Sequence, residues 1–260
     1  MAPKLTIGMA SYKNYTEVWF TVQALRMYHD LTDVEILIID NFGDDNLQNF
    51  VNSWASSQVR YVRFTDAVGP AGAKHRVFEE ARGEWVMMID SHVMLQPGVV
   101  ARFMEWAEAH PGCMDLLQGP LVYDDLKLSA DRMNPVWSGG MWGQWHNSNV
   151  GPGADPYEIY MHGAGLMACR KDAWLGFNPA FRGFGGEEGY IHEKFRQAGR
   201  RVLLLPFLRW VHLFKVDAAP YPVQYEDRIR NYVIGFQEVG LDLSPVIEHF
   251  GAEAVRRHTA

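Results

Sequence analysis

The sequence has little cysteine, no excess of positive charge and no long apolar run, and each absence excludes a class of protein. Cys113 and Cys169 are the two cysteines among 260 residues, too few for a disulfide framework and in no metal-ligand spacing. The 24 basic and 31 acidic residues give a net charge of -7, which opposes nonspecific attraction to nucleic acid or anionic lipid. No apolar run approaches the roughly 20 residues of a membrane helix, and the amino terminus lacks the apolar region of a signal peptide. These features predict a cytoplasmic protein with reduced thiols and no transmembrane segment.

What is abundant is apolar and aromatic residues. Hydrophobic residues make up 48% of the chain, which supports a sizeable buried core. Nine Trp, eleven Tyr and fourteen Phe are many for this length. Aromatic faces commonly stack on bases and sugar rings, but they also fill cores, and for any single residue both interpretations stay open.

The first part of the chain alternates apolar runs with amphipathic stretches. The predicted strands cover residues 4–10, 34–39, 59–64 and 85–89, and the predicted helices cover residues 16–28, 47–56 and 72–82. Such alternation predicts a parallel sheet whose strands are joined by right-handed helical crossovers. Ligands of these sheets bind beyond the carboxyl ends of the strands, which directs attention to Ser11-Tyr12, Asp40-Asn41 and Asp90-Ser91-His92.

The second part of the chain is less regular. It predicts, in order, a helix at 99–109, strands at 114–122 and 163–170, a helix at 185–198, a strand at 201–205 and helices at 223–238 and 244–258. Residues 123–160 are rich in Gly, Pro, Asn and Trp with little periodicity. A segment of this length without regular structure is typical of a functional loop or a lid.

Asp90 and His92 form the strongest local signal, because the apolar strand 85–89 delivers both to its tip. Two residues apart on an extended chain, their side chains point to the same side. A carboxylate and an imidazole placed in this way are able to bind one divalent ion. In an isolated Asp-x-His, a turn-capping Asp beside a solvated His is the more common arrangement, so the context decides.

The stretch GPAGAKHRVFEEARGEWVMMIDSHVMLQPGVV, residues 69–100, resembles family 2 glycosyltransferases, and among them especially the polypeptide N-acetylgalactosaminyltransferases. Its Asp-Ser-His corresponds to a variant of the more usual Asp-x-Asp. The resemblance implies a single α/β, Rossmann-like GT-A domain over residues 1–215, with a mostly parallel central sheet flanked by helices. Its nucleotide-binding half would span about 1–97 and its acceptor-binding half about 98–215. Residues 216–260 would form a carboxyl-terminal helical extension.

Two further blocks extend the resemblance. In GFGGEEGYIHEKFRQAGRRVLLLP, residues 183–206, Glu188 would be the base that deprotonates the acceptor hydroxyl, and Glu187 would hydrogen-bond the acceptor or donor sugar. In FLRWVHLFK, residues 207–215, His212 would join Asp90 and His92 in binding Mn²⁺ or Mg²⁺ on the donor's diphosphate. Taken alone, the two carboxylates would reflect the negative-charge preference of a helix start, and His212 a packed histidine.

The remaining candidate residues concern binding of the donor and of the acceptor. The donor-binding candidates are Ala10, Tyr12, Asp40, Lys74, His75 and Ser91. Asp40 would contact the uracil or ribose, although the following residues depart from the family's Asp-Asp-Gly-Ser. Lys74, His75 and Arg76 would lie near the diphosphate or else be surface charges. The acceptor-binding candidates are Trp137, Trp142, Trp145, His162, Gly185 and Gly186. Those tryptophans would stack on the acceptor or pack a small core beneath the loop, two alternatives of equal standing.

The function implied is metal-dependent transfer of a sugar from a nucleotide sugar, with UDP favoured, to a hydroxyl of a protein, glycan or modified nucleotide. Glu188 favours inversion, since the retaining relatives carry Asn at this position. The alternatives are a retaining transferase, a sugar nucleotidyltransferase and a non-catalytic carbohydrate-binding protein. A nucleotidyltransferase would need a Gly-rich amino-terminal loop that MASYKNY does not provide. The sequence does not indicate the oligomeric state.

Overall fold

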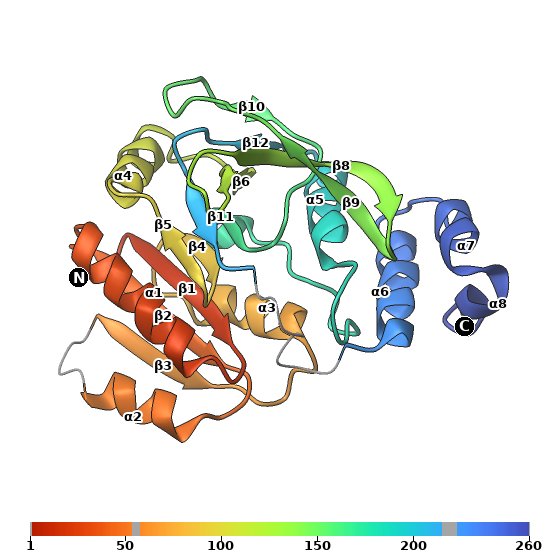
Figure 1. Ribbon diagram of the computed structural model, residues 1–260, viewed down its shortest axis with the longest axis horizontal. Coiled ribbons are helices and arrows are strands. Elements are labelled where there is room, and N and C mark those ends of the chain that lie inside the picture. The colour runs from red at the N-terminus through yellow and green to blue at the C-terminus, as the bar shows by residue number, and fades with distance from the viewer. Residues whose placement is uncertain (1, 54–57, 215–222, 260) are drawn as a thin grey trace.

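An eight-stranded sheet crosses the molecule in the computed structural model, which describes residues 2–53, 58–214 and 223–259 (Figure 1). From one edge to the other its strands are Tyr157–Glu158 (β10), Val202–Leu204 (β12), Leu116–Gln118 (β6), Leu166–Arg170 (β11), Trp85–Asp90 (β4), Leu5–Ser11 (β1), Val34–Asp40 (β2) and Val59–Arg63 (β3). The four strands nearest the amino terminus run parallel, and β11 runs antiparallel between β4 and β6. The predicted α/β fold, with a mostly parallel central sheet flanked by helices, is confirmed.

Helices cover both faces of this sheet. They are Tyr15–Tyr28 (α1), Asp45–Ser53 (α2), Pro70–Glu80 (α3), Val99–Ala109 (α4) and Glu187–Gln197 (α5), with a short 3-10 helix at Lys171–Ala173 (η1). Alternate residues of the strands point to opposite faces, so each strand feeds two cores. Ile36 and Ile38 pack with α1, α2 and α4, whereas Leu37 and Ile39 pack with α3 and α5. Strands buried on both faces read as continuous apolar runs, which is why these strands were predictable.

The strand register places the polar residues Ser11, Asp40 and Asp90 side by side at the carboxyl ends of β1, β2 and β4. Ser11 lies opposite Asp40 across the β1–β2 pair, and Ala10 lies opposite Asp90 across the β1–β4 pair. The carboxyl ends of the parallel strands therefore meet where ligands of such sheets bind.

The structure has a second sheet of five strands, which the sequence did not predict. Its strands, in order, are Val93–Leu95 (β5), Trp210–His212 (β13), Leu121–Val122 (β7), Ser129–Ser138 (β8) and Met141–Asn147 (β9). The prediction that residues 123–160 lack regular structure is wrong, because β8 and β9 form a long antiparallel hairpin (Figure 1). Gly139 and Gly140, both at positive φ, make its two-residue turn, which is a recognisable hairpin signal. Irregular register between Asn134 and Trp137 hides the alternation expected of a strand.

Two predicted elements are each divided in the structure. The strand at 114–122 becomes β6 in the first sheet and β7 in the second. The break falls at Gly119 and Pro120, and Gly119 passes so close to Leu208 that a Cβ there would collide with the Leu208 carbonyl. The helix at 244–258 becomes Ser244–Phe250 (α7) and Ala252–Arg256 (α8), since Gly251 has a φ of 89° that interrupts a helix. Residues 54–56 of the predicted helix at 47–56 lie outside the described residues, as does the predicted boundary at 215–216.

The carboxyl-terminal helices pack against the hairpin. Tyr225–Glu238 (α6) contributes Tyr232 and Phe236 to a cluster with Met133 and Trp142 of β8 and β9 and with Val246 of α7. The predicted extension is therefore joined to the rest of the fold by a core of its own. Among the helices that the structure describes, none has the length and apolarity needed to cross a membrane.

Candidate donor and acceptor site

Asp90, His92 and His212 come together at the tip of β4. Each offers one ligand atom, and these atoms all lie within 4.8 Å of one another. Asp90 and His92 are neighbours along the chain, whereas His212 arrives because β13 pairs antiparallel with β5, which sets His212 opposite Val93. His212 Nε2 lies 3.6 Å from Asp90 Oδ2, and the two imidazole rings have centroids 4.7 Å apart. The three side chains predicted to share one ion are close enough to do so.

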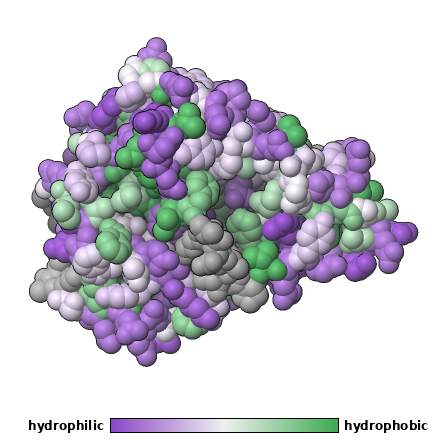
Figure 2. Space-filling model, viewed as in Figure 1, coloured by the Kyte–Doolittle hydropathy of each residue, from purple (hydrophilic) through white to green (hydrophobic). Residues whose placement is uncertain are grey.

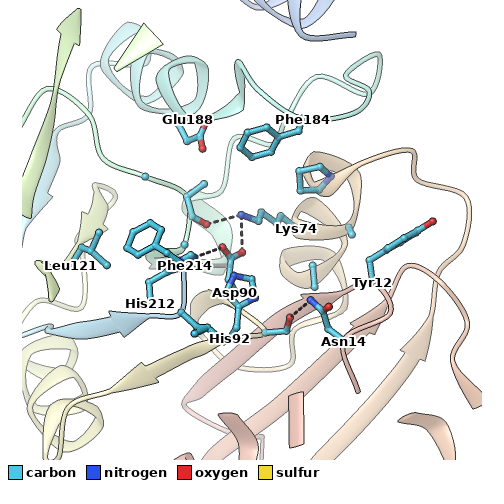
Figure 3. A pocket seen from close by; sticks show the side chains of 18 of the residues that line it. Tyr12, Asn14, Lys74, Asp90, His92, Leu121, Phe184, Glu188, His212 and Phe214 are labelled. Carbon is cyan, nitrogen blue, oxygen red and sulfur yellow. Dashed lines mark hydrogen bonds and ion pairs between the residues drawn. The ribbon is translucent and has the colours of Figure 1, made fainter. Parts of the chain in front are cut away.

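Lys74 is a buried cation beside this cluster. Its Nζ lies 2.9 Å from Asp90 Oδ1 and donates to the Ala164 carbonyl at 2.8 Å (Figure 3). Burial favours the neutral amine, but the attraction of Asp90 outweighs it and raises the pKa of Lys74. Burial also opposes the charge on Asp90, and Lys74 with His212 overcomes this and lowers the pKa of that carboxyl. Asp90 thus stays ionised, with one oxygen toward Lys74 and the other toward His212.

A cavity of about 510 Å³ opens over this cluster at the carboxyl ends of β1, β2 and β4. Its end near these strands is polar and is lined by Ala10, Ser11, Tyr12, Asn14, Asn41 and Ser91. Asn14 Nδ2 donates to Ser91 Oγ at 3.2 Å, which ties the start of α1 to the loop that carries His92 (Figure 3). Within the described structure, Ser11 Oγ and Asn41 Oδ1 are buried without a hydrogen-bond partner. Buried polar atoms of this kind need a partner, and a ligand in the cavity would supply one.

Two donor-binding candidates do not line the cavity. Asp40 is fully buried, and its carboxylate accepts hydrogen bonds from the backbone N–H groups of Phe42, Gly43 and Asp44 and from the Tyr61 hydroxyl. It holds the loop after β2, and Asn41 beside it faces the cavity instead. His75 accepts a hydrogen bond from Trp174 Nε1 at 3.0 Å on the far side of α3. Ala10, Tyr12, Lys74 and Ser91 do line the cavity.

Glu188 lines the cavity at the first turn of α5, whereas its neighbour Glu187 is buried behind it. Glu187 Oε2 accepts the backbone N–H of Gly185 at 2.8 Å, an arrangement that closes the start of the helix. Burial raises the pKa of Glu188, against the opposing pull of Lys74. Burial and the adjacent Glu188 carboxylate raise the pKa of Glu187 to about 8. Of the pair, Glu188 is the carboxyl that a ligand in the cavity is able to reach.

Replacing Glu187 by Gln should make the ligand-free protein more stable at pH 8. The native Glu187 keeps its proton up to a pKa of about 8, whereas an unfolded glutamate loses it near the ordinary value of 4.5. The native state therefore binds more protons in this window, and its stability falls as the pH rises from about 4.5 to about 8. Gln keeps the acceptor for Gly185 and removes the titration, so we expect a gain on the order of 1 kcal/mol at pH 8 and little change at pH 5.

Urea unfolding of both proteins at the two pH values measures this difference. Glu253, on α8 with 84% of its side chain exposed, provides a matched Glu→Gln control that should follow the wild-type pH dependence. An equal effect of Glu187→Gln at pH 5 and pH 8 would contradict the raised pKa.

The tryptophans proposed for the acceptor separate into two groups. Trp145 lines the cavity. Trp142 packs on Gly189 of α5, and its backbone N–H donates to the Tyr232 hydroxyl at 2.8 Å. The centroid of the Trp137 ring lies 4.7 Å from that of Tyr232 and 4.9 Å from that of His249, between the hairpin and the carboxyl-terminal helices. Neither Trp137 nor Trp142 lines the cavity, so their packing matches the small-core alternative.

His162, Gly185 and Gly186 also lie behind the cavity wall. His162 is fully buried, burial lowers its pKa to about 4, and its ring packs edge-on against Trp145. Gly185 and Gly186 have φ values of 108° and 95°, which few other residues adopt, and both back onto α6. They turn the chain so that α5 begins at Glu187 with Glu188 facing inward.

Trp137→Ala should reduce stability without weakening ligand binding in the cavity. The substitution removes a ring that touches Tyr232, His249 and Phe250, so we expect a loss of about 2–3 kcal/mol. Thermal unfolding measures the loss, and a UDP titration with Mn²⁺ below the melting temperature measures binding. Trp137→Phe should recover part of the stability. Weakened binding in a still-folded Trp137→Ala protein would instead place this residue in the ligand site.

Several cavity residues were not predicted individually. Ser11 and Asn41 directly follow strands, so the rule for parallel sheets pointed to them, but their neighbours Tyr12 and Asp40 were preferred. Met133 and Met141 line the cavity from the hairpin, which lies in the segment predicted to be a loop. Phe184 precedes the Gly-Gly turn and lies beside Glu188 in Figure 3. The Gly139-Gly140 pair was the sequence signal that could have revealed the hairpin and with it the two methionines.

Comparison with known proteins identifies the family. The model of Glycosyl transferase family 2 matches residues 6–159, which is more than half of the chain and includes Asp90 and His92. The chain belongs to glycosyl transferase family 2. Among curated members, the succinoglycan biosynthesis protein ExoO of Rhizobium meliloti is 25% identical over 107 residues, which cover 41% of this chain and 30% of ExoO.

Solved structures of transferases share the fold of this family 2 chain. GalNAc-T7, solved with UDP, GalNAc and Mn²⁺, matches with a TM-score of 0.71 and 16% identity, covering 100% of this chain and 55% of its own. The Pyrobaculum calidifontis mannosyltransferase PcManGT, in complex with GDP-Man and Mn²⁺, has a TM-score of 0.60 and 15% identity, with coverages of 99% and 73%. S. aureus TarS 1-349 with UDP-GlcNAc has a TM-score of 0.63 and 13% identity, with coverages of 98% and 72%. At these identities the likeness establishes the GT-A fold.

Proposed function

We propose that this family 2 protein transfers a sugar from a nucleotide sugar, UDP-linked in the first instance, to an acceptor hydroxyl, with inversion at the anomeric carbon. One observation carries the proposal. A single cavity joins the polar end at β1 and β2, the Asp90, His92 and His212 cluster, and the carboxyl group of Glu188.

The polar end suits the nucleoside. Ser11 and Asn41 present buried polar atoms without a partner in the described structure, and Tyr12, labelled in Figure 3, adds an aromatic ring to the lining. Hydroxyl and amide groups at the carboxyl ends of parallel strands are typical nucleotide contacts, and an aromatic ring is able to stack on a base. The solved structures with this fold hold UDP with GalNAc, GDP-Man or UDP-GlcNAc, which makes UDP and GDP the first two nucleotides to test.

The residues at the tip of β4 suit a divalent ion. One carboxylate and two imidazoles, with ligand atoms within 4.8 Å of one another, match the oxygen and nitrogen donors that Mn²⁺ accepts. His212 Nδ1 is buried without a partner in the described structure, so the ring is not held by a competing hydrogen bond there. When bound, the ion would act as a Lewis acid that stabilises charge on the departing diphosphate. Lys74 holds Asp90 ionised and in place.

Glu188 would act as the general base. The acceptor oxygen bonds to the anomeric carbon as the bond from that carbon to the diphosphate oxygen breaks, and the acceptor proton passes to Glu188. Because the pKa of Glu188 is raised, it moves toward neutral pH, and a general base works best when its pKa lies near the operating pH. Lys74 lowers and Asp90 raises the pKa of Glu188, which supports a shared electrostatic environment for Glu188 and the cluster of Asp90, His92 and His212. A single displacement of this kind inverts the configuration at the anomeric carbon. NMR of the product distinguishes the alternatives, because a retaining transferase would give a product with the same anomeric proton coupling as the donor sugar.

UDP and GDP, each alone and with Mn²⁺, should separate donor choice from acceptor choice in a thermal-shift screen. A ligand that binds the native state raises the melting temperature in proportion to the logarithm of its concentration above Kd. We expect a shift with UDP and Mn²⁺ together that EDTA abolishes. No shift with either nucleotide in the presence of Mn²⁺ would refute the proposed function. A shift with GDP and Mn²⁺ but not with UDP and Mn²⁺ would reassign the donor to a GDP-linked sugar.

A further inference from the structure

The end of the cavity around Glu188 is apolar, in contrast to the end around β1 and β2. Besides Glu188, this part of the cavity is lined by thioethers, aromatic rings and aliphatic chains, among them Leu121, Met133, Met141, Trp145, Phe184 and Phe214. Figure 3 shows Phe184 beside Glu188, with Leu121 and Phe214 across the pocket. Among the described lining residues, the hydroxyl, amide and ammonium side chains come from the carboxyl ends of β1, β2 and β4 and from α3, and the Lys74 ammonium is already bonded to Asp90 and to the Ala164 carbonyl.

The polar groups in the floor of this end are already hydrogen-bonded. The Ala164 carbonyl accepts from Lys74 Nζ at 2.8 Å, and the Gly165 carbonyl accepts from the Asp90 N–H at 2.9 Å. The Trp210 indole N–H donates to the Gly119 carbonyl at 2.7 Å. A buried hydroxyl-rich ligand would therefore find Glu188 and few other partners, and burying a polar group without a partner is unfavourable.

The apolar surface continues to the mouth of the cavity. Leu213 and Phe214 are 51% and 43% exposed at its rim, and Figure 2 shows hydrophobic residues gathered around a hollow in this face. Inside, Gly143 leaves room for the Met133 methyl group, which would meet a Cβ at 2.6 Å. Methionine side chains adapt to ligands of different shape, so this wall fits hydrocarbon better than it fits one rigid outline.

We propose that the acceptor is an alcohol whose hydroxyl group is carried by a hydrocarbon or aromatic body, rather than a hydroxyl-rich glycan. The inference rests on the proposed function, since it takes Glu188 as the base that receives the acceptor proton. The hydroxyl would point to Glu188, and the apolar body would lie between Met133, Met141 and Phe184. Removing this body from water would drive binding.

A series of n-alkanols from butanol to octanol tests the inference on the wild-type protein saturated with UDP and Mn²⁺. NMR of ¹³C-methyl-labelled methionine follows Met133 and Met141, with their signals assigned by single substitution. We expect both signals to shift and Kd to fall about fourfold for each added methylene group, as for hydrocarbon leaving water. Glycerol and glucose should leave both signals in place. Affinity that does not depend on chain length, or glucose binding more tightly than octanol, would overturn the inference.

Substitution at the wall provides the second measurement. Met141→Gln should weaken octanol binding by about tenfold while UDP with Mn²⁺ binds as before, because only the apolar end changes. Met27, 72% exposed on α1, provides a matched Met→Gln control that should bind octanol like the wild type. If UDP with Mn²⁺ binds but the alkanols do not, the acceptor inference alone fails. If UDP with Mn²⁺ does not bind, the proposed function fails, and the alkanol series on the ligand-free protein still decides whether this end binds apolar alcohols.

Discussion

Glu188→Gln should abolish most sugar transfer while leaving binding of UDP with Mn²⁺ unchanged. Gln has the shape of Glu but accepts no proton at neutral pH, so the acceptor hydroxyl would have to attack without a base. General base catalysis contributes about 10²–10⁴-fold, and we expect kcat to fall by that factor. Transfer assays at saturating donor give kcat, and a UDP titration with Mn²⁺ gives the affinity.

Two comparisons make this expectation specific to position 188. Glu253→Gln, on the exposed surface of α8, should keep the wild-type kcat. Glu187→Gln should keep most of the activity, because Glu187 lies behind the cavity wall and its oxygen serves the Gly185 N–H. A Glu188→Gln protein that retains more than a tenth of the wild-type kcat would refute the role of Glu188 as the base, and another residue would then have to accept the proton.

Asp90→Ala should remove Mn²⁺-dependent turnover and also destabilise the protein. Even residues that only support a metal ligand affect metal affinity by about 10–100-fold, so the loss of a direct ligand is expected to be at least this large. The substitution also leaves the Lys74 ammonium, 8% exposed, without the carboxylate at 2.9 Å. Breaking a buried ion pair from one side typically costs about 3–5 kcal/mol. Mn²⁺ titration by calorimetry and urea unfolding in EDTA measure the two effects separately.

The double variant Asp90→Ala with Lys74→Met distinguishes these effects. Removing both charges should recover most of the stability, since no isolated buried charge remains, but it should not recover Mn²⁺ binding. Asp45→Ala, whose side chain is 82% exposed, is the matched control for both measurements. Unchanged metal-dependent turnover in Asp90→Ala would show that the cluster at the tip of β4 is not the metal site.

The outcome for the tryptophans shows where sequence patterns stop being informative. Trp137, Trp142 and Trp145 lie within nine residues of each other, and their composition alone does not separate stacking on a ligand from packing in a core. The hairpin register places these residues in different surroundings. Met133 pairs with Trp145 near the cavity, whereas Trp137 pairs with Trp142 against α6. The partners that bury Trp137 come from residues 232–250, about 100 positions away, which no local pattern reveals.

The sequence by itself determined the elements whose signal is local. The strands β1, β2 and β4 are buried on both faces and therefore read as unbroken apolar runs, and the order of strands and helices predicted the parallel sheet. Asp90 and His92 were found together because they are two residues apart on one strand end. The family motifs at residues 69–100 predicted the family, which the match over residues 6–159 confirmed.

Only the tertiary structure decided which distant side chains share the cavity. Lys74 reaches Asp90 because α3 packs beneath β1 and β4, and His212 reaches it because β13 pairs with β5. The hairpin brings Met133 and Met141 into the cavity that Glu188 also lines, whereas Asp40 and His75 have partners outside the cavity. These outcomes depend on strand pairing and helix packing between segments far apart in the chain, whereas sequence periodicity reports only which face of its own element a residue occupies.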